Sequence, residues 1–151
     1  MHKKFPKNLM HMIGQAVMET LHAEKADVPC EVEVLFTDDE RIHLLNKEFR
    51  NVDKSTDVLS FPMVFMEPGA FHADDSELDP ESGRLLLGDV VLSLEHAKAQ
   101  AREYGHSYVH ETVYLTVHSM LHLLGYDHVD EAEEKARMRG REKVIMERLG
   151  I

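Results

Sequence analysis

Three histidines, His118, His122 and His128, carry the clearest chemical signal in the sequence. His118 and His122 are four residues apart in a stretch with helical periodicity, so both imidazoles project from one helix face. That spacing allows two ring nitrogens to approach one metal ion at about 2.0–2.1 Å. Gly125 favours the left-handed conformation that ends a helix, which would let His128 approach from a third direction. Three histidine ligands leave a fourth tetrahedral position for water, so the spacing predicts a catalytic zinc site.

The elements that must position these histidines follow from hydrophobic periodicity and from capping residues. The predicted order is helix, strand, helix, strand, strand and three helices, at residues 9–21, 30–36, 37–49, 58–65, 85–93, 93–104, 107–124 and 130–149. Ser93 and Ser107 are predicted N-caps, and Thr37 with Glu40 forms a predicted capping box. Pro62 limits its strand to a sheet edge or a broken strand. The order predicts one α+β domain over residues 1–151, with helices packed on a small mixed β-sheet.

The composition limits the partners of such a domain. The 151 residues are 43% hydrophobic and 30% charged, which is typical of one globular domain. Lys and Arg number 17 and Asp and Glu 28, and the formal net charge of −11 argues against a general nucleic-acid coat protein, which needs a broad basic face, but does not exclude a local basic groove. Cys30 is the one cysteine, which favours a reducing compartment. No apolar run approaches the roughly 20 residues of a membrane span, and the expected location is the cytoplasm.

The segment of residues 66–83 is unusually acidic. Residues 67–81 contain six acidic residues, two prolines and neither lysine nor arginine. This composition predicts a solvated loop or a mobile lid. Such a loop could exclude some nucleic acids or contact a basic protein.

Three blocks of sequence occur in a characteristic order over about residues 30–130. The first is L-N-x-x-F-R-x-x-D-x-x-T-D-V-L-S-F-P, from Leu45 to Pro62, and the second is L-G-D-V-V-L-S, which leads into a helix. The third is H-x-x-L-H-L-x-G-Y-D-H, which contains the histidines. Together they resemble the YbeY family of endoribonucleases that mature ribosomal RNA. Ser119 departs from the glycine usual in that family, and the segment of residues 66–83 is not typical of it.

The resemblance implies a zinc-dependent endoribonuclease specific for single-stranded RNA. Family members act in maturing the 3′ end of 16S ribosomal RNA and in ribosome quality control. The resemblance implies one Zn²⁺ per chain on His118, His122 and His128, and a catalytic role for Arg50. The implied partners are ribosomal RNA and the small ribosomal subunit or its proteins. Neither DNA nor a membrane is an expected partner.

Chemistry independently supports a role for Arg50. Cleavage of a phosphodiester adds negative charge to the non-bridging oxygens, and a guanidinium can bind two of them. The neighbours four residues away, Asn46 and Lys54, are not acidic, so no helical ion pair engages Arg50. From the residues alone, a solvated arginine or one paired with Asp53 or Asp57 stays open.

Further residues have both a functional and a structural interpretation. Asp127 could orient a histidine ligand from outside or hold the turn. Glu111 could be a supporting acid or a base, although an exposed helical glutamate is the commoner case. On the last helix, Arg137 and Arg141 share a face, which is either a strip that contacts RNA or part of a solvated, salt-bridged helix. No residue is identifiable as the general base.

Two other functions stay open. The spacing H-x-x-x-H-x-x-G-x-x-H is also that of metzincin zinc peptidases. Those enzymes have a glutamate directly after the first histidine as general base, whereas this chain has Ser119, which cannot take that role. The second alternative is a non-catalytic, ribosome-associated module in which zinc only stabilises the turn. No cysteine or further nearby histidine would close such a structural site.

Overall fold

The most apolar strand is the centre of the sheet. In the computed structural model, which describes residues 8–127 and 132–151, β3 (Leu85–Ser93) lies between the two other strands. It pairs in parallel with β1 (Cys30–Thr37) and antiparallel with β2 (Val58–Pro62), so the sheet is mixed, as predicted. β3 is buried at most positions, which explains why its sequence is a nearly continuous apolar run.

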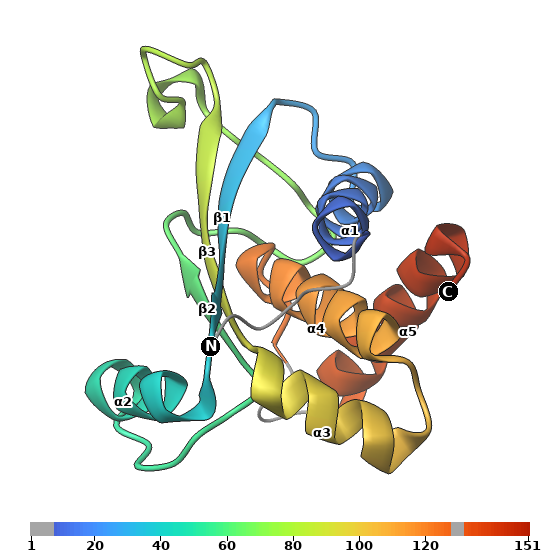
Figure 1. Cartoon of the computed structure of the whole chain (residues 1–151). Helices are drawn as coiled ribbons and strands as arrows, with labels where there is room; N and C mark the ends of the chain where they lie inside the picture. Colours follow the sequence, from blue (N-terminus) through green and yellow to red (C-terminus); the bar gives the residue numbers. More distant parts are fainter. Residues whose placement is uncertain (1–7, 128–131) are drawn as a thin grey trace.

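Helices cover the two faces of the sheet unequally. The large core joins the sheet to α1 (Leu9–Ala23), α4 (Tyr108–Leu123) and α5 (Ala132–Leu149), and α3 (Leu94–Tyr104) packs against α4. Figure 1 shows α4 in the middle of this layer, and α2 (Asp39–Arg50) beside the end of the sheet. Val90 of β3 belongs to the large core, whereas the neighbouring Val91 packs in a small second core with Ile42 of α2. The observed α+β fold confirms the predicted class.

The second core packs α2 against the sheet. Ile42 is completely buried there with Leu59 and Val91. Full burial of one such side chain stabilises a fold by about 1.5–3 kcal/mol. This small cluster therefore fixes the helix whose last residue is Arg50.

Helix starts agree with the predicted caps at two positions and differ at one. The side chains of Ser93 and Ser107 cap α3 and α4, as predicted. The capping box predicted at residues 37–40 is wrong, because Thr37 is still paired in the sheet. Helix α2 begins one residue later, where the Asp38 carboxylate accepts a hydrogen bond from the amide of Arg41 at 2.9 Å.

A long connection joins β2 to β3 and contains the acidic segment. It includes one turn of 3₁₀-helix, η1 (Asp75–Glu77), and exposed acidic side chains. Met66, at its start, is buried and belongs to the large core. The acidic segment is thus solvated over most of its length but attached to the core at its beginning. Across residues 8–127 and 132–151, none of the helices has the length and apolar character that a bilayer crossing requires.

Candidate active site

His118 and His122 face each other on α4. Their ring centroids are 4.6 Å apart, the rings are nearly perpendicular, and their Nε2 atoms are separated by 3.1 Å. Both line a pocket of about 870 Å³ whose walls also include Arg50, Tyr126 and residues of β2. The predicted third ligand, His128, lies outside the described residues. Without it, residues 8–127 and 132–151 do not gather three metal-ligating side chains.

The partners of the other ring nitrogens favour one tautomer of each neutral ring. Nδ1 of His122 lies 2.9 Å from the backbone carbonyl oxygen of Tyr126, which can only accept, so Nδ1 donates. Nδ1 of His118 lies 2.5 Å from Oε2 of Glu142. In the neutral rings the protons are therefore on Nδ1 and the lone pairs on Nε2.

This arrangement fits two ligands of one metal ion. Two nitrogens that bind a tetrahedral ion at about 2.0–2.1 Å lie about 3.3 Å apart. The observed separation of 3.1 Å between the Nε2 atoms is close to that value. Hydrogen bonds from the second ring nitrogen to a carboxylate or a carbonyl are also the usual support of a metal-bound histidine. The residues present therefore fit a zinc ion.

Glu142 of α5, which is not among the residues predicted from the sequence, orients His118. Its carboxylate is buried and accepts from His118 and, at 2.9 Å, from the hydroxyl of Tyr114. Burial alone would raise the pKa of Glu142, but the hydrogen bonds and charge of His118, the Tyr114 hydroxyl and the charge of Arg139 together lower it. Glu142 thus stays ionised as an acceptor. One feature of the sequence could have indicated this role: Glu142 is an acidic residue within the apolar stripe of the last helix, from Met138 to Ile145.

The two acids predicted from the sequence, Asp127 and Glu111, lie in different environments. Asp127 is exposed and lines the pocket in the turn after α4. Glu111 is only 4% exposed, so the interpretation as an exposed helical glutamate is wrong. Burial raises the pKa of Glu111, which His106 opposes and Asp57 reinforces. Glu111 is therefore influenced by charged groups of two segments, the turn between α3 and α4 and the loop before β2.

The turn after α4 is fixed by close packing. Gly125 has φ +99°, in the left-handed region that the sequence predicted, and a Cβ there would lie 2.1 Å from the carbonyl oxygen of Met66. The next residue, Tyr126, is buried, and its hydroxyl donates to the carboxylate of Glu24. Burial and Glu24 raise the pKa of Tyr126 to about 12. The carbonyl that accepts from His122 is therefore held by contacts on both sides.

Two arginines of α5 reinforce this turn. Arg141 donates to Glu24 at 2.7 Å, and Arg137 donates to the carbonyl oxygen of Pro68 at 2.9 Å and lies over the ring of Tyr126. These contacts favour the structural interpretation of the face that Arg137 and Arg141 share.

Arg50 reaches the same pocket from the other side of α4. Its Nη2 donates to the carbonyl oxygen of Ser60, and its guanidinium lies 5.5 Å from the ring centroid of Phe61. Among the residues that the structure describes, Arg50 forms no ion pair, and Asp53 instead contacts His43 at 2.7 Å. A guanidinium has five N–H donors, so most of those on Arg50 remain to bind a ligand.

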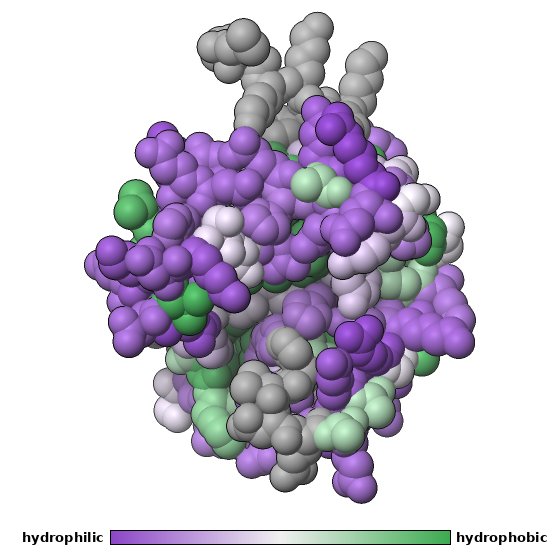
Figure 2. All heavy atoms as spheres, turned by 90° about the horizontal axis from the view of Figure 1, so that it is seen from below, coloured by the Kyte–Doolittle hydropathy of each residue, from purple (hydrophilic) through white to green (hydrophobic). Residues whose placement is uncertain are grey.

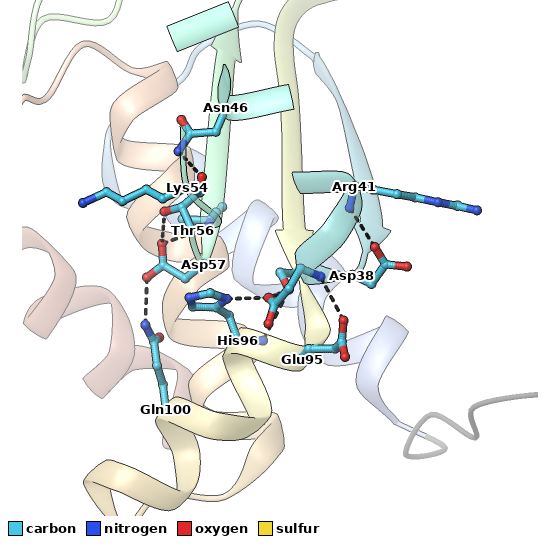
Figure 3. Close-up of polar contacts among 12 residues, drawn as sticks. Asp38, Arg41, Asn46, Lys54, Thr56, Asp57, Glu95, His96 and Gln100 are labelled. Carbon is cyan, nitrogen blue, oxygen red and sulfur yellow. Dashed lines mark hydrogen bonds and ion pairs between the residues drawn. The ribbon is translucent and has the colours of Figure 1, made fainter. Parts of the chain in front are cut away.

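The loop between Arg50 and β2 is held by side-chain hydrogen bonds (Figure 3). Asn46 donates to the carbonyl of Lys54 at 2.9 Å, which closes the loop onto α2. Asp57 accepts from the amide of Val58 at 2.7 Å and from Gln100 of α3 at 3.3 Å. These contacts give Asp57 a structural role and hold the loop against α3.

The free edge of β2 is a poor template for a substrate peptide. The amide of Ser93 donates to the carbonyl of Asp57, and the amide of Met63 donates to the carbonyl of Leu87. The backbone N–H and C=O groups of odd-numbered residues in β2 therefore point towards β3. The backbone groups of Ser60 therefore point to the open edge of the sheet, where the carbonyl oxygen accepts a hydrogen bond from Arg50. The other outward-facing residue near the end, at position 62, is a proline without an N–H.

Ser119, which follows the first histidine of α4, does not line the pocket. It is completely buried, and its Oγ lies 2.5 Å from Oγ of Ser60. The position that holds the general base in metzincin peptidases is thus used here to join α4 to β2. The blocked strand edge and the buried serine both disfavour the peptidase alternative.

The surface around the α2–α3 end of the molecule is mainly hydrophilic. Figure 2 shows this face with hydrophobic atoms exposed only in separate spots. A polar surface of this kind suits a charged, hydrated ligand better than an apolar one.

An α+β fold that brings two oriented histidines and an available arginine into one pocket has the make-up of a hydrolase acting on phosphate esters. The family model described as Endoribonuclease YbeY matches residues 1–150. The chain therefore belongs to the YbeY family, as the resemblance indicated.

Individual relatives agree over nearly the whole chain. Endoribonuclease YbeY of Clostridium botulinum strain 657 is 45% identical over 157 residues, which cover 99% of this chain and 90% of that protein. The protein of the same name from Acetivibrio thermocellus is 41% identical and covers 95% and 88%. A solution structure of a Thermotoga maritima protein is similar with a TM-score of 0.62 at 26% identity, over 97% of this chain and 85% of that chain.

Proposed function

We propose that this chain is a zinc-dependent endoribonuclease that cuts single-stranded RNA, in maturation of the 3′ end of 16S ribosomal RNA and in ribosome quality control. The endoribonuclease activity follows from family membership. The proposed partners are the small ribosomal subunit or its proteins, in the cytoplasm. The observation that carries the zinc proposal is the pair of Nε2 atoms 3.1 Å apart, with both Nδ1 atoms engaged by acceptors.

The proposed ligands of the ion are His118, His122 and His128. A bound zinc ion would supply Lewis acidity towards the scissile phosphate. Glu142 and the carbonyl of Tyr126 keep the Nδ1 protons in place, so each described imidazole presents its Nε2 lone pair to the pocket.

Arg50 has the proposed role of binding the scissile phosphate. One N–H of its guanidinium is engaged by Ser60, which orients the plane of the group against Phe61. The other N–H groups can donate to two non-bridging oxygens, whose negative charge increases as the bond is cut. Arg50 therefore has more to contribute in the transition state than in the ground state.

The shape of the site supports single-stranded substrates. The scissile phosphate must enter a pocket of about 870 Å³ between α4, the loop before β2 and the turn after α4. A flexible strand can bend into such a recess, whereas a stiff A-form duplex exposes its phosphates on a regular convex surface.

The non-catalytic module is less well supported than the enzyme. A metal that only stabilises a turn does not need a neighbouring arginine or a large pocket. Here Arg50 forms no ion pair within the described part of the chain and shares the pocket with both histidines.

The test measures zinc content and cleavage of labelled RNA in the same preparations. We expect wild type to bind about one zinc and to cut a single strand but not the matched duplex. His118→Ala should lose zinc and cleavage, and Arg50→Ala should keep zinc but lose cleavage. Arg148→Gln, on α5 and paired with Glu19 at 3.2 Å, is the control and should behave as wild type. Wild type that holds zinc and leaves every single strand intact would overturn the proposal.

A further inference from the structure

One arginine of α5 differs from its neighbours on that helix. Arg137, Arg141 and Arg148 each donate a hydrogen bond to another element. Arg139 is exposed, and it forms no hydrogen bond or ion pair with any residue in the ranges 8–127 and 132–151. Its side chain nevertheless lines the pocket that contains His118, His122 and Arg50. Arg139 is thus an available cation at the rim of the candidate active site.

Arg139 and Arg50 approach the pocket from opposite sides. Helix α4 packs against β2 and against α5, and Figure 1 places it between them. Arg50 is fixed on β2 through the carbonyl of Ser60, whereas Arg139 belongs to α5. The histidines of α4 therefore lie between two guanidinium groups that share one pocket.

A second cation extends the α5 side. Lys135 precedes Arg139 by four residues, so the two side chains lie on one helix face. Both line a small cavity of about 30 Å³ that adjoins His118 and Glu142. Each carboxylate oxygen of Glu142 accepts a hydrogen bond, from His118 and from Tyr114, and Arg139 acts on Glu142 through its charge without a hydrogen bond among the described residues.

The overall charge makes this placement significant. The chain has a formal net charge of −11, which repels a polyanion in general. Available cations on both sides of one pocket provide the local attraction that binding of a nucleic acid strand needs. Because the two guanidinium groups belong to different elements on the two sides of the histidines, they can contact successive phosphates of one strand.

We propose that Arg139, assisted by Lys135, binds a phosphate next to the scissile one, so that the RNA strand crosses α4 from Arg50 to α5. This inference rests on the proposed function, because it assigns a second phosphate subsite to the same active site. Arg139 is a binding residue in this scheme and does not contact the reacting atoms. Its loss therefore raises KM and leaves kcat nearly unchanged.

The test compares Arg139→Gln with the control Arg148→Gln over a series of salt concentrations. Steady-state kcat and KM are measured on labelled single-stranded RNA, and affinity is measured in an Arg50→Ala background, where we expect cleavage to be about 10²–10³-fold slower. Loss of one phosphate contact should weaken binding about fivefold at 0.1 M salt and reduce the slope of log K against log salt by about 0.7. Lys135→Gln should change both quantities in the same direction by less.

The outcomes separate this inference from the proposed function. If wild type cuts RNA and Arg139→Gln has the KM and salt slope of Arg148→Gln, the second subsite is wrong and the ribonuclease stands. If Arg139→Gln lowers kcat with KM unchanged, the residue acts on the reacting phosphate and the inference is also wrong. If wild type neither binds nor cuts RNA, the proposed function itself fails.

Discussion

The two sides of the pocket are built in different ways. The histidine side is held by buried groups from distant parts of the chain: Glu142 contacts His118, and Glu24 holds Tyr126, whose carbonyl accepts from His122. The arginine side is held by near neighbours in sequence, since Arg50 contacts Ser60 and Phe61. The histidines are therefore rigidly oriented, whereas Arg50 has one hydrogen bond and a partly exposed ring to hold it.

This difference matches the chemistry proposed for each side. A metal site needs ligands whose direction is fixed before the ion arrives. A group that binds a substrate must also release the product, so it needs donors that are free to exchange partners. Changes on the histidine side should consequently affect stability and metal content, and changes on the arginine side should affect turnover alone.

The largest expected effect is that of Gly125→Val on the histidine side. A side chain at φ +99° is strained, and its Cβ would collide with the carbonyl of Met66. We expect the free energy of unfolding to fall by about 3 kcal/mol or more, with loss of metal, measured by urea denaturation and zinc analysis. Gly140→Ala is the control, since a Cβ there meets nothing within 4 Å. Equal stability of the two variants would contradict the packing described for this turn.

On the arginine side, Arg50→Ala should lower kcat about 10²–10³-fold, the usual loss for one donor to the transition state. Arg50→Lys should recover only part of that rate, because an ammonium cannot form the two-pronged contact of a guanidinium. Zinc content and the free energy of unfolding should stay within error of wild type. If Arg50→Ala loses zinc as well, the separation of the two sides is wrong.

A smaller effect is expected from Glu142→Gln. The amide keeps the shape but can present its NH₂ group to Nδ1 of His118, so the orientation of that ring is weakened. Loss of such a supporting group typically lowers metal affinity about 10–100-fold. Competition with a zinc chelator measures the change. Glu147→Gln is the matched control on the same helix, and a chelator curve identical to that control would show that Glu142 does not support the site.

The smallest effect should come from Ser119→Ala, at the junction of the two sides. It removes the hydroxyl contact with Ser60, which is partly buried against α4 and keeps only its longer hydrogen bond to the carbonyl oxygen of residue 119. We expect a loss of about 1 kcal/mol in the free energy of unfolding and little change in zinc content. Thermal denaturation measures the first quantity. A severe loss of zinc without loss of stability would mean that Ser119 acts on the site directly.

The sequence predicts the parts of this molecule that depend on local physics. The strand of residues 85–93, the edge position of the strand with Pro62, and the caps Ser93 and Ser107 all follow from periodicity and side-chain chemistry. The cap at Asp38 was missed because the end of a strand and the start of a helix compete for the same residues.

The supports of the site could not be predicted in this way. Glu142 lies 24 residues from His118, and Glu24 lies 102 residues from Tyr126. No local pattern reports such pairings, because they arise only when α1, α4 and α5 pack together. Arg139 was indistinguishable in sequence from Arg137 and Arg141, and only the packing of α5 shows which of them reaches the pocket.

The central claim is that the histidines hold zinc for RNA cleavage while Arg50 acts on the phosphate. The most direct measurement is the cleavage rate of a labelled single-stranded RNA after zinc is removed from the wild-type protein and returned to it. We predict that removal abolishes cleavage, that about one equivalent of zinc restores it, and that zinc-loaded Arg50→Ala stays about 10²–10³-fold slower than wild type. Full cleavage by the zinc-free protein would contradict the claim.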